Sequence, residues 1–120
     1  MYRFSEDLDL QEIVGSEIQQ ICVGRYDVQF HFHSGTSIGG QADVTLLDGA
    51  EEIGRWTEDA NWSTLAFQKL LNITITNYSV PHDRVLRIEF DNGLVLELHD
   101  SSDQYESFLI TKPDGAMIVV

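Results

Sequence analysis

Two histidines, His31 and His33, are the residues whose types and spacing come closest to a chemical site. Alternate residues of a β-strand share a face, so the two imidazoles would lie side by side. A zinc site needs such a pair and one or two further ligands. The groups that could complete it are His82, Asp83, His99 and Asp100. Because the spacing supplies only two ligands, and Gln29 continues the same polar row, we favour a solvated strand face and expect no metal.

Acidic residues are the second group that could do chemistry. The chain of 120 residues carries 20 acids against seven Lys and Arg, a net charge of −13, and residues 1–60 hold 12 of these acids. Neighbouring carboxylates such as Glu51 and Glu52 can exchange protons, but such pairs are unavoidable in so acidic a chain. The sequence has no G-x-S-x-G elbow and no glycine-rich phosphate loop before a helix. We therefore expect no catalytic residues, no cofactor and no enzymatic activity.

The negative charge bears on the choice of partner. It repels nucleic acid and anionic membranes and attracts cationic surfaces. Trp56 lies within the acidic segment 48–59, where an aromatic ring would supply contact area and the acids would steer association. Trp56 could equally belong to the core, and the acidity could serve solubility alone. The predicted partner-binding residues are Asp48, Glu51, Glu52, Trp56, Glu58 and Asp59.

The chain has one cysteine, Cys22, in the apolar run 21–23. A single thiol forms no internal disulfide, and this one is more typical of a small buried hydrophobic residue than of a nucleophile. The first nine residues carry acids where a signal peptide needs an apolar core. No apolar stretch approaches the length of a membrane span. We expect a cytoplasmic protein.

The elements that must position these residues are mainly strands. The clearest is 26–33, where Val28, Phe30 and Phe32 alternate with polar residues. Gly39 and Gly40 would bend a third strand over 37–47, and residues 50–60 resemble a loop or a ragged helical turn. Further strands are expected at 17–23, 72–78, 85–90, 94–98, 107–111 and 117–120.

One helix is predicted over residues 62–71. Trp62, Leu65, Ala66 and Leu70 follow helical spacing, and Phe67 and Leu71 widen the apolar stripe. The sequence thus predicts a single domain over 1–120 of the α+β class, with a mainly antiparallel sheet, curled or barrel-like, and one main helix packed on it. The predicted core includes Phe30, Phe32, Leu65, Leu70, Ile88, Phe90, Leu96 and Leu98.

Two hairpins repeat one pattern at an offset of 58 residues. Either an internal duplication or the shared template of tight hairpins would produce this match. The matching positions are Val28, Phe30, Phe32, Gly35 and Ile38 in the first hairpin, and Leu86, Ile88, Phe90, Gly93 and Leu96 in the second.

The second half of the chain carries a short series of motifs. Leu70-Leu71 ends the predicted helix, Phe90-x-Asn92-Gly93 forms a hairpin, and Tyr105-Glu106-Ser107-Phe108 follows near the C-terminus. This series resembles a group of small uncharacterised bacterial proteins. Some small acidic proteins of this general kind are immunity proteins, which neutralise a toxin made by the same cell. The resemblance implies no catalytic residues.

The combined expectation is a non-enzymatic acidic binding protein, in its sharpest form an immunity protein or inhibitor that neutralises a basic partner such as a bacterial toxin. The alternatives are a metal-binding or enzymatic module built on His31 and His33, and a structural domain that assembles through exposed sheet edges.

Overall fold

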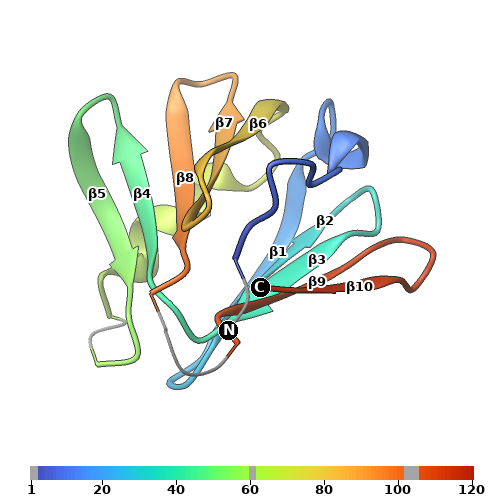
Figure 1. Cartoon of the computed structure of the whole chain (residues 1–120). Coiled ribbons are helices and arrows are strands. Elements are labelled where there is room, and N and C mark those ends of the chain that lie inside the picture. The colour runs from blue at the N-terminus through green and yellow to red at the C-terminus, as the bar shows by residue number, and fades with distance from the viewer. Residues whose placement is uncertain (1–2, 60–61, 102–105) are drawn as a thin grey trace.

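The computed structural model describes residues 3–59, 62–101 and 106–120, which form two antiparallel sheets (Figure 1). The first sheet has the order β1 (Ile18–Val23), β2 (Val28–Phe32), β3 (Ser37–Gly40), β9 (Phe108–Thr111) and β10 (Met117–Val119). The second has the order β5 (Glu51–Trp56), β4 (Val44–Asp48), β8 (Leu94–His99), β7 (Val85–Phe90) and β6 (Ile75–His82). Two 3-10 segments, η1 (Gln11–Ile13) and η2 (Trp62–Leu70), complete the described elements.

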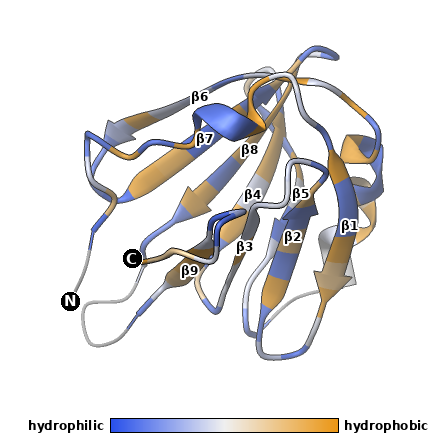
Figure 2. Ribbon diagram, turned by 90° about the vertical axis from the view of Figure 1, so that its right-hand side faces the viewer, coloured by the Kyte–Doolittle hydropathy of each residue, from blue (hydrophilic) through white to orange (hydrophobic). Residues whose placement is uncertain are grey.

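The core lies between the sheets because the strands alternate as the sequence predicts. Apolar and polar residues alternate along β2, where every apolar residue is buried (Figure 2). Phe30, Phe32, Ile88 and Phe90 all lie within one cluster of buried side chains. The predicted core positions on the strands are confirmed, as is Leu70. Leu65 was predicted to be buried, and this is wrong, because 75% of it is exposed.

The predicted α+β class is also wrong, because the residues that the structure describes are mostly antiparallel β and contain no α-helix. The 62–70 segment is the 3-10 element η2, which has three residues per turn. Residues three apart then share a face, so Phe67 and Leu70 are buried while Leu65 is turned outward. Phe67 contacts Phe30 of the first sheet, with ring centroids 5.8 Å apart. The side chain of Trp62 lies outside the described part of the chain.

Two further corrections concern strands. Residues 51–56 are strand β5, not a loop. Gly54 hides this strand from the sequence pattern, because it stands at a buried position where an apolar side chain would be expected. Glycine fits there because a Cβ would lie 3.2 Å from the Cβ of Ala66. The predicted long strand over 37–47 is two strands in different sheets, β3 and β4. A Cβ on Gly40 would lie 2.1 Å from the carbonyl oxygen of Ser107, so this position requires glycine for the close approach of β9.

The two halves of the chain follow one plan. Advancing every strand number by five converts the order β1-β2-β3-β9-β10 into β6-β7-β8-β4-β5, which is the order of the second sheet. Each half therefore builds three consecutive strands of one sheet and contributes a two-stranded hairpin to the other. The pattern that the two hairpins share in the sequence is thus part of a structural repeat that covers all ten described strands.

Hydrogen bonds between the halves are reciprocal at an offset of 57 residues. Gly15 donates its N–H to the carbonyl of Ile75 over 2.8 Å, and Asn72 donates to the carbonyl of Ile18 over 3.3 Å. Gly15 and Asn72 also share a left-handed backbone, with φ of 84° and 65°. These contacts relate the halves by a pseudo-twofold axis, which passes beside the bridge between Glu17 and Thr74.

Candidate functional site

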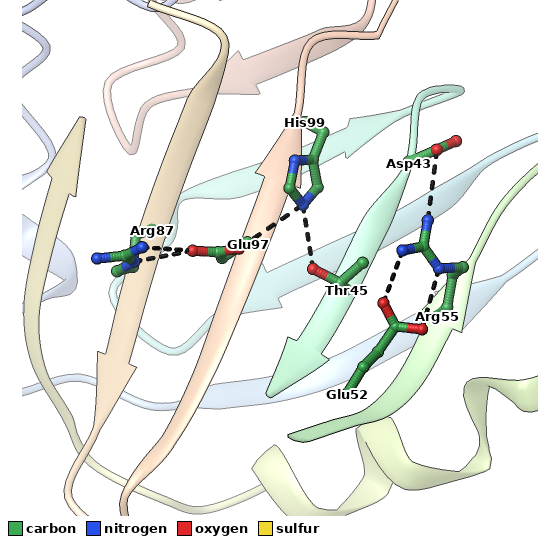
Figure 3. A network of polar contacts seen from close by, with 7 residues as sticks. All are labelled: Asp43, Thr45, Glu52, Arg55, Arg87, Glu97 and His99. Atoms are coloured by element: carbon green, nitrogen blue, oxygen red, sulfur yellow. Dashed lines mark hydrogen bonds and ion pairs between the residues drawn. The ribbon is translucent and has the colours of Figure 1, made fainter. Parts of the chain in front are cut away.

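The outer face of the second sheet carries a row of polar side chains (Figure 3). Strands β7 and β8 bury every second residue, so the residues between them point away from the core. Arg87 and Glu97 are directly opposite in the register of these strands, and Thr45 of β4 is opposite Glu97 on its other side. Arg55 of β5 follows Thr45 in the same row. The sheet therefore places polar groups of four strands side by side, and those of β5, β7 and β8 are charged.

Arg87 and Glu97 form the central ion pair. The Nε of Arg87 donates to Oε2 of Glu97 over 2.9 Å, and Nη2 lies 2.8 Å from the same oxygen. The Glu97 side chain is only 13% exposed, whereas that of Arg87 is 41% exposed. The pair thus neutralises a largely buried carboxylate while part of the guanidinium stays open to solvent.

His99 lies on the other side of Glu97. Its Nε2 is 3.1 Å from the hydroxyl oxygen of Thr45 and 3.8 Å from Oε1 of Glu97. Burial lowers the pKa of His99 below the ordinary value, and the Glu97 carboxylate opposes this shift. Thr45 is only 4% exposed, and Glu97 approaches the same ring nitrogen as the hydroxyl. The three groups therefore lack the arrangement of a nucleophile, a base and an orienting acid.

A second ion cluster lies at the edge strand β5. Arg55 donates to Glu52 through Nε over 3.1 Å and through Nη2 over 2.6 Å, and its Nη1 is 3.5 Å from Asp43. The hydrogen bond to Arg55 lowers the pKa of Glu52, and the same bond raises the pKa of Arg55. Both side chains are about two-fifths exposed, so solvent screens this pair.

A pocket of about 480 Å³ lies at one end of strands β6, β7 and β8. Its lining includes His82, Arg84, Arg87 and His99, together with Glu97 and Asp100. Arg84 donates through Nη1 to the backbone carbonyl of Asp100 over 3.0 Å. The pocket therefore combines the polar row with the turn that joins β6 to β7.

Asp100 fixes the wall of this pocket. It is 2% exposed, and Nη1 of Arg3 lies 3.1 Å from its Oδ2. The hydroxyl of Ser107 donates to Oδ1. Because a buried carboxylate is stable only when it is paired and hydrogen-bonded, these contacts hold the N-terminal segment, the end of β8 and the start of β9 together.

The structure separates the predicted partner-binding residues. Asp48, Glu51 and Glu52 are exposed at the turn of the β4–β5 hairpin. Glu58 and Asp59 are exposed beyond the opposite end of β5, about 20 Å away at the usual rise of a strand.

Trp56 is the predicted partner-binding residue whose position differs most from the others. It is completely buried, and its indole nitrogen donates to the carbonyl of Gly24 over 3.0 Å. The ring therefore belongs to the core, which was the other interpretation of this residue. The exposed acids of segment 48–59 accordingly lack an aromatic ring from Trp56.

His31 and His33 point away from the core on the first sheet. His31 Nε2 lies 3.3 Å from Oε1 of Gln29, and His33 Nδ1 lies 3.3 Å from Oε1 of Gln19. Among residues 3–59, 62–101 and 106–120, no three His, Cys, Asp or Glu side chains gather closely enough to hold a metal ion. Of the other candidate ligands, His82, His99 and Asp100 line the pocket of the second sheet, and Asp83 lies in the turn beside it.

Sequence reasoning missed Arg87, Glu97 and Thr45 as parts of one site. A usable signal was present, because Arg87 and Glu97 are equally far from Asn92 at the centre of the predicted Asp91-Asn92-Gly93 turn. In a tight hairpin such residues face each other. The contribution of β4 could not be foreseen, since nothing local pairs β4 with β8.

Comparison with known proteins found no relative from which a function could be transferred to this chain. Searches with family models, among curated proteins and among solved structures each found no match for this chain. No helix in the described part of the chain is long and apolar enough to span a membrane. Any function must therefore be argued from the surface itself.

Proposed function

We propose that this chain is a non-enzymatic binding protein that engages a cationic surface of a partner protein. The proposed contact is the acidic tip, defined as Asp48, Glu51, Glu52 and Asp91. In its sharpest form the protein is an inhibitor or immunity protein that masks a basic partner such as a toxin. We expect neither nucleic acid nor an anionic membrane as a partner, because both would be repelled by a net charge of −13.

The observation that supports this proposal is the meeting of two turns at one end of the second sheet. Asp48 is opposite Glu51 on β5 and opposite Leu94 on β8. Asp91 lies in the turn just before Leu94, and both turns lie at the upper end of the left-hand sheet in Figure 1. Residues 40 positions apart in the chain thus contribute to one acidic surface.

Three of the four carboxylates of the tip are available to a partner, whereas that of Glu52 is paired with Arg55. Asp48, Glu51 and Asp91 are exposed and form no salt bridge with any residue that the structure describes. Exposed charges of one sign accelerate association with an oppositely charged surface, and salt screens this effect. The free thiol of Cys22 agrees with a reducing compartment such as the cytoplasm, where we propose that the encounter takes place.

The test begins with affinity capture from the native host, and the captured partner is then used in stopped-flow association experiments. The tip variant Asp48→Asn/Glu51→Gln should slow association several-fold at low salt, and the difference should shrink as salt rises. A second double variant, Glu58→Gln/Asp59→Asn, probes the distant acids of the original prediction.

The matched control is Glu6→Gln/Asp7→Asn, which removes the same number of exposed charges elsewhere. If all three variants slow association equally, the net charge acts without a defined site, and the acidic tip is not the contact surface. If association is indifferent to salt and to every variant, the proposed electrostatic contact is wrong, and an exposed strand edge becomes the better candidate.

A further inference from the structure

We propose that the pocket at the end of β6, β7 and β8 binds a small molecule through its phosphate or carboxylate group, with Arg84 and Arg87 as the anion-binding residues. This site is separate from the acidic tip. The tip lies at the Leu94 end of β8 and the pocket at the His99 end, about 17 Å apart at the usual rise of a strand.

Arginine and histidine side chains are concentrated in this pocket. The whole chain has seven Lys and Arg and four His, and the pocket lining contains two of each group. Elsewhere the net charge of −13 repels an anion. A pocket that collects Arg84, Arg87, His82 and His99 in such a chain offers an anion two guanidinium groups and two imidazoles.

The acids of the pocket are already engaged. Glu97 accepts two contacts from Arg87, and Asp100 is held by Arg3 and Ser107. The lining therefore holds the guanidinium groups of Arg84 and Arg87 and two carboxylates, and Arg3 reaches one of these carboxylates from outside the lining. Asp83, in the turn beside it, is exposed to solvent, where its charge is well screened.

Hydrogen-bond donors remain for a ligand. Both contacts of Arg87 with Glu97 use its Nε and Nη2 toward a single carboxylate oxygen. Its Nη1 has no partner among the described residues, although a guanidinium has five N–H donors. The Nδ1 of His82 accepts from the backbone N–H of Arg84 over 3.3 Å, so the neutral ring carries its hydrogen on Nε2. Arg87 and His82 thus both offer donors to an oxyanion.

The pseudo-twofold axis supplies an internal comparison. The first sheet has a pocket of about 320 Å³ that includes Gln29, Gly39 and Gln41. By strand register these positions are equivalent to Arg87, Glu97 and His99. The fold therefore forms a depression on both sheets, but only one of them has cationic walls. Packing alone does not require those cations, which points to a ligand.

The size of the pocket limits the ligand. A volume of about 480 Å³ is within the range of small-molecule sites and is too small for a folded partner. Phosphate and carboxylate groups are the oxyanions that arginine binds best in proteins. The shared ligand chemistry is therefore a small molecule with one of these groups.

Nuclear magnetic resonance of the histidine rings can test this site, because the chain contains its own control. Inorganic phosphate and acetate are titrated separately at constant ionic strength and pH. We expect at least one of them to shift the ring signals of His82 and His99 along a saturable curve. His31 and His33, on the other sheet, should not respond. The anion that saturates at the lower concentration identifies the preferred group.

Two substitutions sharpen the test. Arg87→Gln gives β7 the residue that β2 has at the equivalent position 29, and it should weaken binding about tenfold or more because a charge-assisted contact is lost. Arg84→Gln should also weaken binding, and thermal melting checks that this variant still folds. Lys69→Gln, a cation on η2 outside the pocket lining, should bind like the wild type.

The proposal is overturned if neither anion gives saturable shifts at His82 and His99. It is equally overturned if all four histidines respond alike, because that result describes general screening of charge. Saturable binding that survives Arg87→Gln and Arg84→Gln would also contradict the assignment of these two residues.

Discussion

Strands β2 and β7 occupy equivalent places in the two halves and bury the same three positions. These are Val28, Phe30 and Phe32 in β2, and Leu86, Ile88 and Phe90 in β7. The turns that follow also agree, because Gly35 and Gly93 have φ of 100° and 86°. Both halves use the same device to close the hairpin, since only glycine adopts this backbone without strain.

The outer faces of the same strands differ. The second sheet carries four charged or titratable groups and one threonine where the first sheet has amide, glycine or aliphatic residues. By register, Arg87, Glu97, His99, Thr45 and Arg55 correspond to Gln29, Gly39, Gln41, Leu109 and Val119.

This difference distinguishes residues that the fold requires from residues that it does not require. Residues that agree between the halves are those that fill the core or turn the chain. Residues that disagree are not fixed by the shared architecture, since one half folds without them. The polar row and its pocket are therefore better candidates for function than any group that both sheets possess.

The largest expected effect tests the shared inner face. Phe32→Ala and Phe90→Ala remove equivalent buried rings that are 1% and 3% exposed. Each should lower the free energy of unfolding by about 3–5 kcal/mol, because a core cavity remains. Urea denaturation of both variants measures the two costs. If one substitution costs less than about 1 kcal/mol, the two positions are not equivalent in packing.

A smaller effect tests the equivalence of Gly15 and Asn72. Both residues have a left-handed backbone, which costs a residue with a Cβ about 1–2 kcal/mol unless it is asparagine or aspartate. We expect Gly15→Ala and Asn72→Ala to destabilise the fold by about that amount. The exchanges Gly15→Asn and Asn72→Gly should each change stability by less than about 0.5 kcal/mol. Thermal or urea unfolding that ranks the exchanges as worse than the alanines would contradict this expectation.

Much of the inner architecture could be predicted from local alternation. The core positions on β2, β7 and β8 followed from a period of two, and the turn at Asp91-Asn92-Gly93 followed from its residue types. The errors arose where tertiary contacts replaced a local signal. Gly54 occupies an inward position of β5 because η2 packs against it. The chain changes sheets between Gly40 and Val44 through only the three residues 41–43, which contain no glycine or proline to mark a turn.

The outer face was less predictable for a different reason. A polar residue at an outward position has no local signature that separates solvation from recognition. Asp48, Glu51 and Glu52 were predicted as binding residues from the many acids of segment 48–59, whereas Asp91 was not predicted. The separation of this segment's acids between the two ends of β5 depends on its being a strand. The pocket needs the β4–β8 pairing and the contact of Arg3 with Asp100, which join residues far apart in sequence.

The smallest expected effect concerns His99 and tests the outer face directly. Burial lowers the pKa of His99, while Glu97 and Asp43 favour its charged form and Arg55 and His82 oppose it. The unfolded chain, with an ordinary histidine pKa of about 6.5, therefore takes up this proton at a higher pH than the folded chain does. The stability that neutral His99 contributes is fully present above pH of about 6.5 and is lost as the pH falls toward the lower pKa of the folded state.

We expect His99→Gln, which copies Gln41 of the other half, to flatten the loss of stability in this acidic window. His33→Gln on the exposed face of the first sheet should leave that slope unchanged, and urea unfolding across the window measures both. If the two variants alter the slope equally, burial beside Thr45 does not set the pKa of His99, and the outer faces of the two sheets differ less than their residues indicate.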